Sequence, residues 1–319
     1  MRYEGFYLYS LEPLILGRMG QLPATFPQWA VQAARRSSKP PIVIEHPAWF
    51  SGYWLKLLRK KQEAARLRSI GWRYQLFRND PLEHQRCRWL GLEGVFASHN
   101  VFVDESIYRP LAITRIYDAV YVAKAERFKR HELACEVKRL HFLMPSPVDP
   151  ATLDSRLRHA TVNSKDMSKE NIVRTLNQAA CTLALSREEG GMYACVESLL
   201  CGVPVVSTKS RGGRAIFLNS NNSITVETDT PHAIAQAVQT LIEAPLDPTL
   251  IRAQVLKELN VHRERMVNHL SIEVSGTREK AAEFYRRLFT KSDRVERIGD
   301  EIFVPDSALE IPPSVLRLG

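Results

Sequence analysis

Short apolar segments alternate with helix-like segments along most of the chain, and this alternation most constrains the fold. The apolar segments are rich in Val, Ile, Ala and Leu, and they predict strands at 40–46, 93–98, 115–124, 159–164, 181–186, 202–208 and 223–227. Between them, helical patterns predict helices at 51–77, 127–144, 168–180, 192–201 and 230–244. Apolar strands that alternate with helices form a parallel sheet covered on both faces. The sequence therefore predicts an α/β fold with Rossmann-like units.

The length of 319 residues suggests about two domains. Pro110 interrupts the chain before a new predicted strand, so we expect a short first domain at 1–112 and a regular second domain at 113–280. We expect the remainder, 281–319, to begin as a helix and to pack across the other domains.

Composition excludes several classes of protein. Hydrophobic residues make up 45% of the chain and charged residues 25%, as in ordinary globular proteins. No apolar run approaches the roughly 18 residues that span a bilayer, and no signal peptide is recognised. The cysteines are five, an odd number without CxxC spacing, which indicates reduced thiols, a cytoplasmic location and no zinc site.

Positive charge is concentrated between Lys56 and Arg88, where ten Lys or Arg residues stand against three Asp or Glu. One interpretation is a solvated helix face; the other is an anionic partner, which would be a membrane surface, nucleic acid or a phosphorylated substrate. Trp72, Tyr74 and Phe77 lie in the same stretch. Aromatic residues in such a stretch are more often part of a core, but beside this charge they also suggest peripheral contact with an anionic membrane. No nucleic-acid recognition motif accompanies the charge, so we expect no nucleic-acid partner.

The stretch SREEGGMYACVESLLCGVPVVST holds the candidate ligand site. It places Glu189 in a loop after a predicted strand, at the edge where open α/β sheets bind ligands. Gly190 and Gly191 let the backbone approach a ligand and open a helix, whose N-terminus favours phosphate. Glu197, farther along that helix, can accept hydrogen bonds from the vicinal hydroxyls of a ribose. This order of residues indicates a nucleotide carrying a second polyhydroxy group near Glu189.

The same stretch resembles the ExxxxxxxE region of the retaining GT-B glycosyltransferases of family 4. The matching positions are Ser186, Glu189, Gly190, Glu197, Gly202, Pro204, Val205 and Val206. Lys124 and Lys129 are similar to the two basic residues that grip the donor diphosphate in that family. Residues 99–110 resemble the family's interdomain linker, and residues 40–52 resemble the acceptor-domain strand that ends in an active-site His, here His46.

The resemblance implies a GT-B fold, in which two Rossmann-like domains face each other across a cleft, with the N-terminal domain shortened here. It implies transfer of a sugar from a nucleotide diphosphate sugar to a hydroxyl of a glycan or lipid-linked acceptor, with retention, and with no metal or cofactor. It assigns the donor to Lys124, Lys129, Gly190, Gly191 and Glu197, and catalysis to Glu189 and His46.

Departures from the family pattern leave two alternatives open. The glycine-rich N-terminal loop is not visible, and Phe217 stands where the loop GGRAIFL would carry an acid. The chain could instead be a non-catalytic sugar-nucleotide-binding or scaffold protein, or an epimerase or phosphorylase on the same fold.

Overall fold

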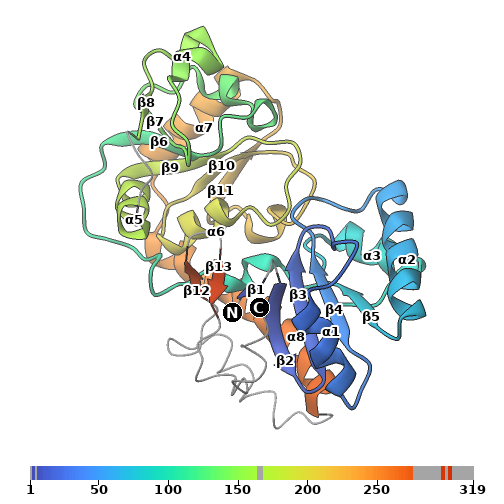
Figure 1. Cartoon of the computed structure of the whole chain (residues 1–319). Helices are drawn as coiled ribbons and strands as arrows, with labels where there is room; N and C mark the ends of the chain where they lie inside the picture. The colour runs from blue at the N-terminus through green and yellow to red at the C-terminus, as the bar shows by residue number, and fades with distance from the viewer. Residues whose placement is uncertain (1, 4–5, 164–167, 276–295, 299–300, 304–319) are drawn as a thin grey trace. The chain divides into compact units, whose positions relative to one another are not determined.

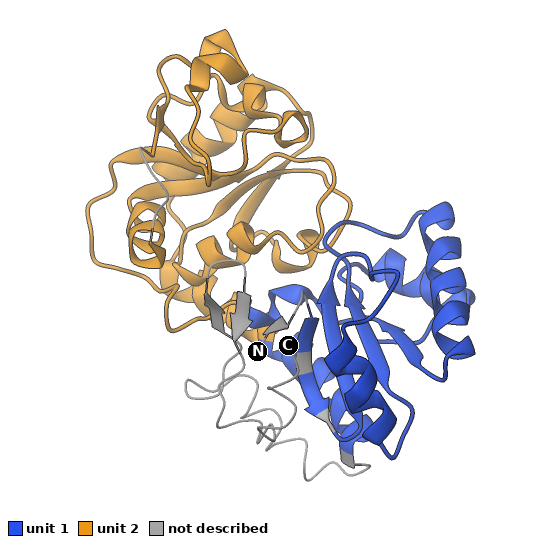
Figure 2. Ribbon diagram, viewed as in Figure 1, with its two compact units in different colours: residues 1–102, 260–319 blue, residues 103–259 orange. Residues whose placement is uncertain are grey.

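The computed structural model describes residues 2–3, 6–163, 168–275, 296–298 and 301–303. The chain forms two compact units, which are coloured separately in Figure 2. Unit 1 comprises residues 1–102 and 260–319, and unit 2 comprises residues 103–259. The chain therefore enters unit 2 earlier than the boundary expected after residue 112, and it returns to unit 1 before residue 280. The helix expected to begin at residue 281 lies outside the described residues.

Unit 2 contains a six-stranded parallel sheet in the order β11-β10-β9-β6-β7-β8 (Figure 1). The strands are β6 (Tyr117–Val122), β7 (Leu140–Leu143), β8 (Thr161–Val162), β9 (Ala179–Ala184), β10 (Val205–Thr208) and β11 (Ser223–Val226). The chain builds outward from β6 to β8 and then crosses back to β9 on the other side of β6. The strand order thus reverses between β6 and β9, as it does in doubly wound dinucleotide-binding sheets.

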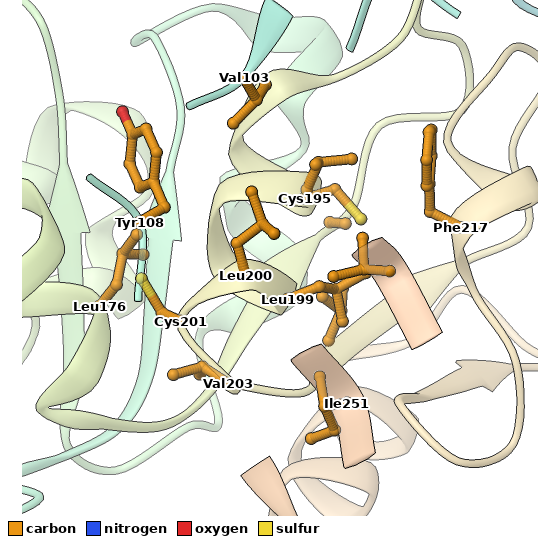
Figure 3. Packing of buried hydrophobic residues seen from close by; sticks show 14 of the residues in the cluster. Val103, Tyr108, Leu176, Cys195, Leu199, Leu200, Cys201, Val203, Phe217 and Ile251 are labelled. Carbon is orange, nitrogen blue, oxygen red and sulfur yellow. The ribbon is translucent and has the colours of Figure 1, made fainter. Parts of the chain in front are cut away.

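Helices cover both faces of this sheet. They are α4 (Pro150–Leu153), α5 (Lys169–Asn177), α6 (Tyr193–Leu200), α7 (Pro231–Glu243) and the start of α8 (Pro248–Ser275). On one face, Cys195 and Leu199 of α6 pack in the same core as Phe217 and Ile251 (Figure 3). On the other face, α7 packs against side chains of β6 and β7. Ser168 caps the N-terminus of α5, because its hydroxyl accepts from the backbone N–H of Asn171 at 3.3 Å.

The helix predicted over 127–144 is wrong. The segment forms two short 3-10 turns, at Arg127–Lys129 and His131–Ala134, and then β7. Arg130 separates the turns with a left-handed φ of 54°, a conformation that a helix cannot continue. Its Nε donates to the carbonyl of Leu185 at 2.6 Å, so a contact 55 residues away overrides the local helical pattern.

Unit 1 has a smaller sheet in the order β1-β2-β3-β4-β5. Its strands are β1 (Arg2–Tyr3), β2 (Phe6–Leu11), β3 (Leu14–Met19), β4 (Ile42–His46) and β5 (Arg73–Leu76). Only β3, β4 and β5 are parallel, and β2 joins them as the antiparallel arm of a hairpin. Unit 1 is thus a reduced Rossmann-like unit, with three parallel strands where unit 2 has six. A further hairpin pairs β12 (Glu296–Ile298) with β13 (Glu301–Phe303).

Alternate residues of the unit 1 strands supply two separate cores. Ile15 and Ile44 face a core that includes Met266 and Leu270 of α8. Leu16, Val43 and their neighbours face the opposite core. That second core is covered by α1 (Gln28–Arg36), α2 (Trp54–Ser69) and α3 (Pro81–Trp89). The alternation follows from the two-residue period of side chains along a strand.

The single helix predicted over 51–77 is also wrong, because α2 ends at Ser69 and β5 begins at Arg73. Gly71, with a φ of 79°, allows the chain to leave the helix there. Trp72, Tyr74 and Phe77 are buried, with 7%, 4% and 1% of their surface exposed. These three aromatic rings belong to the core of unit 1 and cannot form a membrane contact.

A buried carboxyl group ties the segment after β4 to the start of α3. The Ser51 hydroxyl donates to Glu83, and the backbone N–H of Asn79 donates to the same carboxyl group at 3.3 Å. The side-chain amide of Asn79 also donates to the carbonyl of Pro47 at 2.9 Å. Burial raises the pKa of the Glu83 carboxyl group to about 8. Residues 47–51 are therefore held at two points.

Glu83 makes the stability of unit 1 depend on pH. Below about pH 4.5 the carboxyl group is protonated in both the folded and the unfolded state. As the pH rises toward 8, only the folded state keeps the proton, so the free energy of unfolding falls by up to about 1.4 kcal/mol per pH unit. We expect Glu83→Gln, which mimics the protonated group, to flatten this fall.

Urea unfolding followed by tryptophan fluorescence measures this effect, because all five tryptophans lie in unit 1. The variant should match the wild type near pH 4.5 and exceed it near pH 8. Parallel pH profiles for the two proteins would show that Glu83 does not titrate as inferred.

Candidate active site

The candidate site lies where the strand order of the unit 2 sheet reverses. The segment 123–130 leaves the carboxyl end of β6, and the segment 185–192 leaves the carboxyl end of the adjacent strand β9. In open α/β sheets the two connections diverge at this point, and ligands bind in the crevice between them. The predicted residues Lys124, Lys129, Glu189, Gly190 and Gly191 all lie on these two segments.

Lys129 and Glu189 are in direct contact, although 60 residues separate them in the sequence. Lys129 Nζ donates to Glu189 Oε1, and only 13% and 8% of the two side chains are exposed. The Ser186 hydroxyl donates to the same carboxylate oxygen. A charged pair this far out of water is stable only when its members compensate each other and are hydrogen-bonded. An anion that replaced Glu189 as the partner of Lys129 would meet an ammonium group already desolvated.

The other predicted residues on this edge occupy different environments. Gly190 and Gly191 are buried and lead through Met192, which has a left-handed φ of 52°, into α6. Glu197 is half-buried on α6, between the buried residues Val196 and Ser198. Lys124 is exposed, and its side chain forms no ion pair within the described part of the chain.

His46 ends β4 in unit 1, and its side chain is 1% exposed. Its Nε2 lies 2.8 Å from the Tyr9 hydroxyl, and the rings of Phe77 and Phe102 are 5.0 and 6.0 Å away. Burial, with a smaller effect from His99, lowers the pKa of His46 to about 3, so the imidazole is neutral. The environment is that of a core histidine, and contact with a sugar or acceptor stays a prediction that requires the ring to become exposed.

Two arginines, Arg130 and Arg214, hold the strand ends that carry the site, and no sequence pattern indicated either of them. Arg214 is 1% exposed, and its Nη2 donates to the carbonyls of Ser186 and Thr208 at 3.0 and 2.9 Å. Burial lowers the pKa of Arg214. Arg130 binds the Leu185 carbonyl and also pairs with Asp229 at 2.6 Å. No spacing rule reveals such residues, because their partners lie on other strands.

The loop after β10 packs against the loop that carries Glu189. The backbone N–H of Glu189 donates to the carbonyl of Arg211 at 3.0 Å, and that of Gly213 donates to the carbonyl of Gly190 at 2.7 Å. Gly212 has a φ of 108°, and a Cβ atom there would lie 1.9 Å from the carbonyl oxygen of Glu189. Only glycine at this position permits the close approach of the two loops.

Within the described residues, no three His, Cys, Asp or Glu side chains gather as metal ligands. In the same part of the chain, no helix is both long and apolar enough to cross a membrane.

Comparisons with known proteins identify a related family and a related fold. Residues 128–244, which include the segment from Lys129 to Glu197, match the family described as glycosyl transferases group 1. The matched segment lies within unit 2. The comparison with curated proteins found no significant match.

The similarity to solved structures extends beyond this segment, over 76–81% of the chain. Anabaena Alr3699/HepE in complex with UDP has a TM-score of 0.55 and 12% identity, over 76% of this chain and 75% of that one. Sucrose-phosphate synthase of Thermosynechococcus elongatus has a TM-score of 0.53 and 13% identity, over 79% and 69%. AviGT4, a glycosyltransferase of avilamycin A biosynthesis, has a TM-score of 0.53 and 16% identity, over 81% of each chain. The predicted GT-B fold, with two Rossmann-like units, is confirmed.

We predict that Arg214→Met destabilises unit 2 by about 2–4 kcal/mol, because it removes the buried guanidinium that donates to the carbonyls of Ser186 and Thr208. Urea unfolding followed by far-UV circular dichroism measures the loss, with tryptophan fluorescence as the separate signal of unit 1. Arg187→Gln is the matched control, since the side chain of Arg187 is 75% exposed and its pair with Asp229 is 3.4 Å long. Equal stability of the two variants would contradict the structural role of Arg214.

Proposed function

We propose that the protein transfers a sugar from a nucleotide diphosphate sugar to an acceptor hydroxyl, with retention and without a metal. The observation that carries this proposal is the buried pair of Lys129 and Glu189 at the point where the strand order reverses. In this pair, the cation Lys129 is suited to bind a diphosphate, and the carboxylate Glu189 is suited to bind the sugar attached to it. A donor that spans both groups places its scissile bond between them.

Lys129 has the chemistry needed by the leaving group. Cleavage of the donor leaves a diphosphate with increased negative charge, and fixed cations stabilise that charge in the transition state. The N-terminus of α6, reached through Gly190 and Gly191, offers backbone N–H groups to the same anion. Lys124 follows the same strand and is exposed, so it is available to the diphosphate as well.

Glu189 and Glu197 have separate roles in this proposal. Glu189 stands beside Lys129 and would bind hydroxyls of the donor sugar and stabilise the positive charge that develops on the sugar. Glu197 lies one to two turns into α6, and its half-buried carboxylate would bind the ribose hydroxyls. The complexes of Anabaena HepE with UDP and with UDP-glucose make uracil the first base to test.

The alternatives differ in turnover and products. A non-catalytic sugar-nucleotide-binding protein would bind the donor and release no nucleoside diphosphate, with or without acceptor. An epimerase or phosphorylase would convert one nucleotide sugar, or react it with phosphate, without a glycan acceptor. The desolvated pair beside the sugar position favours transfer, because it supplies both leaving-group and sugar stabilisation.

We expect mutation of Glu197 and mutation of Glu189 to have opposite effects on UDP binding and on kcat. Glu197→Ala should weaken UDP binding about tenfold to a hundredfold, because a hydrogen bond to a charged group contributes about 1.5–3 kcal/mol. Glu189→Gln should leave UDP binding intact, or tighten it by freeing Lys129, while lowering kcat for donor cleavage. Calorimetry with UDP and assays with UDP-glucose, both in EDTA, measure the two effects.

Glu188→Gln, one residue from Glu189, is the control for a general effect of charge in this loop. Loss of UDP binding in Glu189→Gln with normal binding in Glu197→Ala would reverse the assigned roles. Loss of activity in EDTA that Mg²⁺ or Mn²⁺ restores would contradict the metal-free mechanism.

We also propose that unit 1 attaches the enzyme to an anionic membrane on its cytoplasmic face, where a lipid-linked acceptor would be met. The exposed apolar side chains that support this are Trp54, Leu55 and Leu58 on α2 and Leu82 and Trp89 on α3. The rings of Trp54 and Trp89 are stacked with their centroids 6.2 Å apart, so the two helices share one patch. The Arg86 guanidinium lies 5.3 Å from the Trp54 ring and adds positive charge. Apolar side chains flanked by cations are typical of membrane-surface helices.

We expect Trp54→Ser and Trp89→Ser to reduce sedimentation with anionic vesicles severalfold, because each removes a large ring from the patch. Binding of the wild type should also fall as salt rises. Ile70→Ser is the control, since Ile70 is 54% exposed but follows the far end of α2. Equal binding to neutral vesicles, or equal losses in all three variants, would contradict this membrane surface.

A further inference from the structure

Unit 1 contains a cavity of about 370 Å³ beside the carboxyl ends of β3 and β4. One wall is the segment after β4, from Pro47 to Ser51, and the opposite wall is one face of α2. Lys56, Arg59, Lys60 and Glu63 form that face, at the spacing that places side chains on one side of a helix.

The carboxylates around this cavity are already paired. Lys60 forms an ion pair with Glu45, whose second oxygen accepts from the Tyr74 hydroxyl at 2.7 Å. Glu63 pairs with Arg66, whose Nε lies 3.1 Å from its carboxylate. Arg59 is exposed at the cavity and forms no ion pair within the described residues. Lys56, Arg59 and Lys60 thus outnumber the two carboxylates that line the cavity, and Arg66, which lies outside the lining, compensates Glu63, so the cavity carries excess positive charge.

The cavity also has a fixed wall and an aromatic surface. The hydrogen bonds from Asn79 to Pro47 and from Ser51 to Glu83 fix the segment after β4 in place. Trp49 lies on this segment, lines the cavity and is 45% exposed. A large flat ring beside cationic groups suits a ligand with an apolar part next to an anionic group.

We propose that this cavity binds the phosphate group of a phosphorylated acceptor, with Arg59 and Lys56 on the phosphate and Trp49 against the adjoining organic part. The planar guanidinium of Arg59 matches two phosphate oxygens at once, and the ammonium of Lys56 adds a second cation. The excess of more than one cation favours a phosphate ester over a carboxylate, which carries a single charge. The assignment of this ligand as the acceptor rests on the proposed function, whereas the phosphate site itself does not.

A phosphate ester of this kind could belong to a soluble sugar phosphate or to a lipid phosphate. The two sources share the group that Arg59 and Lys56 would bind. They differ in the part that lies against Trp49, which is a sugar ring in one and a hydrocarbon chain in the other.

The test is calorimetry on the full chain with UDP at saturation, so that phosphate cannot bind at the donor site. The probes are glucose 6-phosphate against glucose, and farnesyl phosphate against farnesol in the same detergent. We expect one phosphorylated probe to bind at least tenfold more tightly than its unphosphorylated partner. Arg59→Gln and Lys56→Gln should each weaken that binding about tenfold, as expected for a lost hydrogen bond to a charged group.

Arg68→Gln is the matched control, because Arg68 is exposed on the same helix and does not line the cavity. Binding of glucose 6-phosphate or of farnesyl phosphate identifies the soluble or the lipid source. Equal affinity with and without the phosphate, binding of neither phosphorylated probe, or equal effects of Arg59→Gln and Arg68→Gln would overturn the proposal. UDP binding is measured first and separately, and its absence would overturn the proposed function while leaving the phosphate result to stand.

Discussion

The buried contact between Lys129 and Glu189 is the interaction on which the candidate site depends. It neutralises two charges that the fold has withdrawn from water, and it joins the segments that leave β6 and β9. Arg130 and Arg214 hold the same strand ends through backbone carbonyls, so the cationic groups are positioned before a ligand arrives. Such preorganisation lowers the reorganisation that a diphosphate leaving group would otherwise require.

Helix α2 of unit 1 contributes to both the cavity and the exposed apolar patch. The residues Lys56, Arg59 and Lys60 of α2 line the cavity, whereas Trp54, Leu55 and Leu58 are exposed apolar residues of the same two turns. The 3.6-residue period separates these groups onto different sides of the helix. A phosphate site and an apolar patch are thereby placed next to each other, an arrangement suited to an acceptor presented at a lipid surface.

Local sequence patterns predicted the elements whose apolar character is strongest. The strands at β4, β6, β9, β10 and β11 and the helices α5, α6 and α7 lie where their patterns indicated. The patterns failed where a tertiary contact or a single glycine decided the backbone. Arg130 turns to reach Leu185 and ends a predicted helix, and Gly71 releases the chain from α2 toward β5. The hairpin of β2 and β3 and the long helix α8 were not predicted from the sequence pattern.

The sequence by itself determined the α/β alternation, the ExxxxxxxE spacing and the excess of positive charge in 56–88, because each depends only on the order of residues. The tertiary structure alone decided which of these residues meet. Parallel strands bring their carboxyl ends to one edge, so Lys129 contacts Glu189 while Lys124 stays exposed. Packing buried His46 and Trp72 and left Trp54 and Trp89 exposed, because burial depends on which face of each element meets the core.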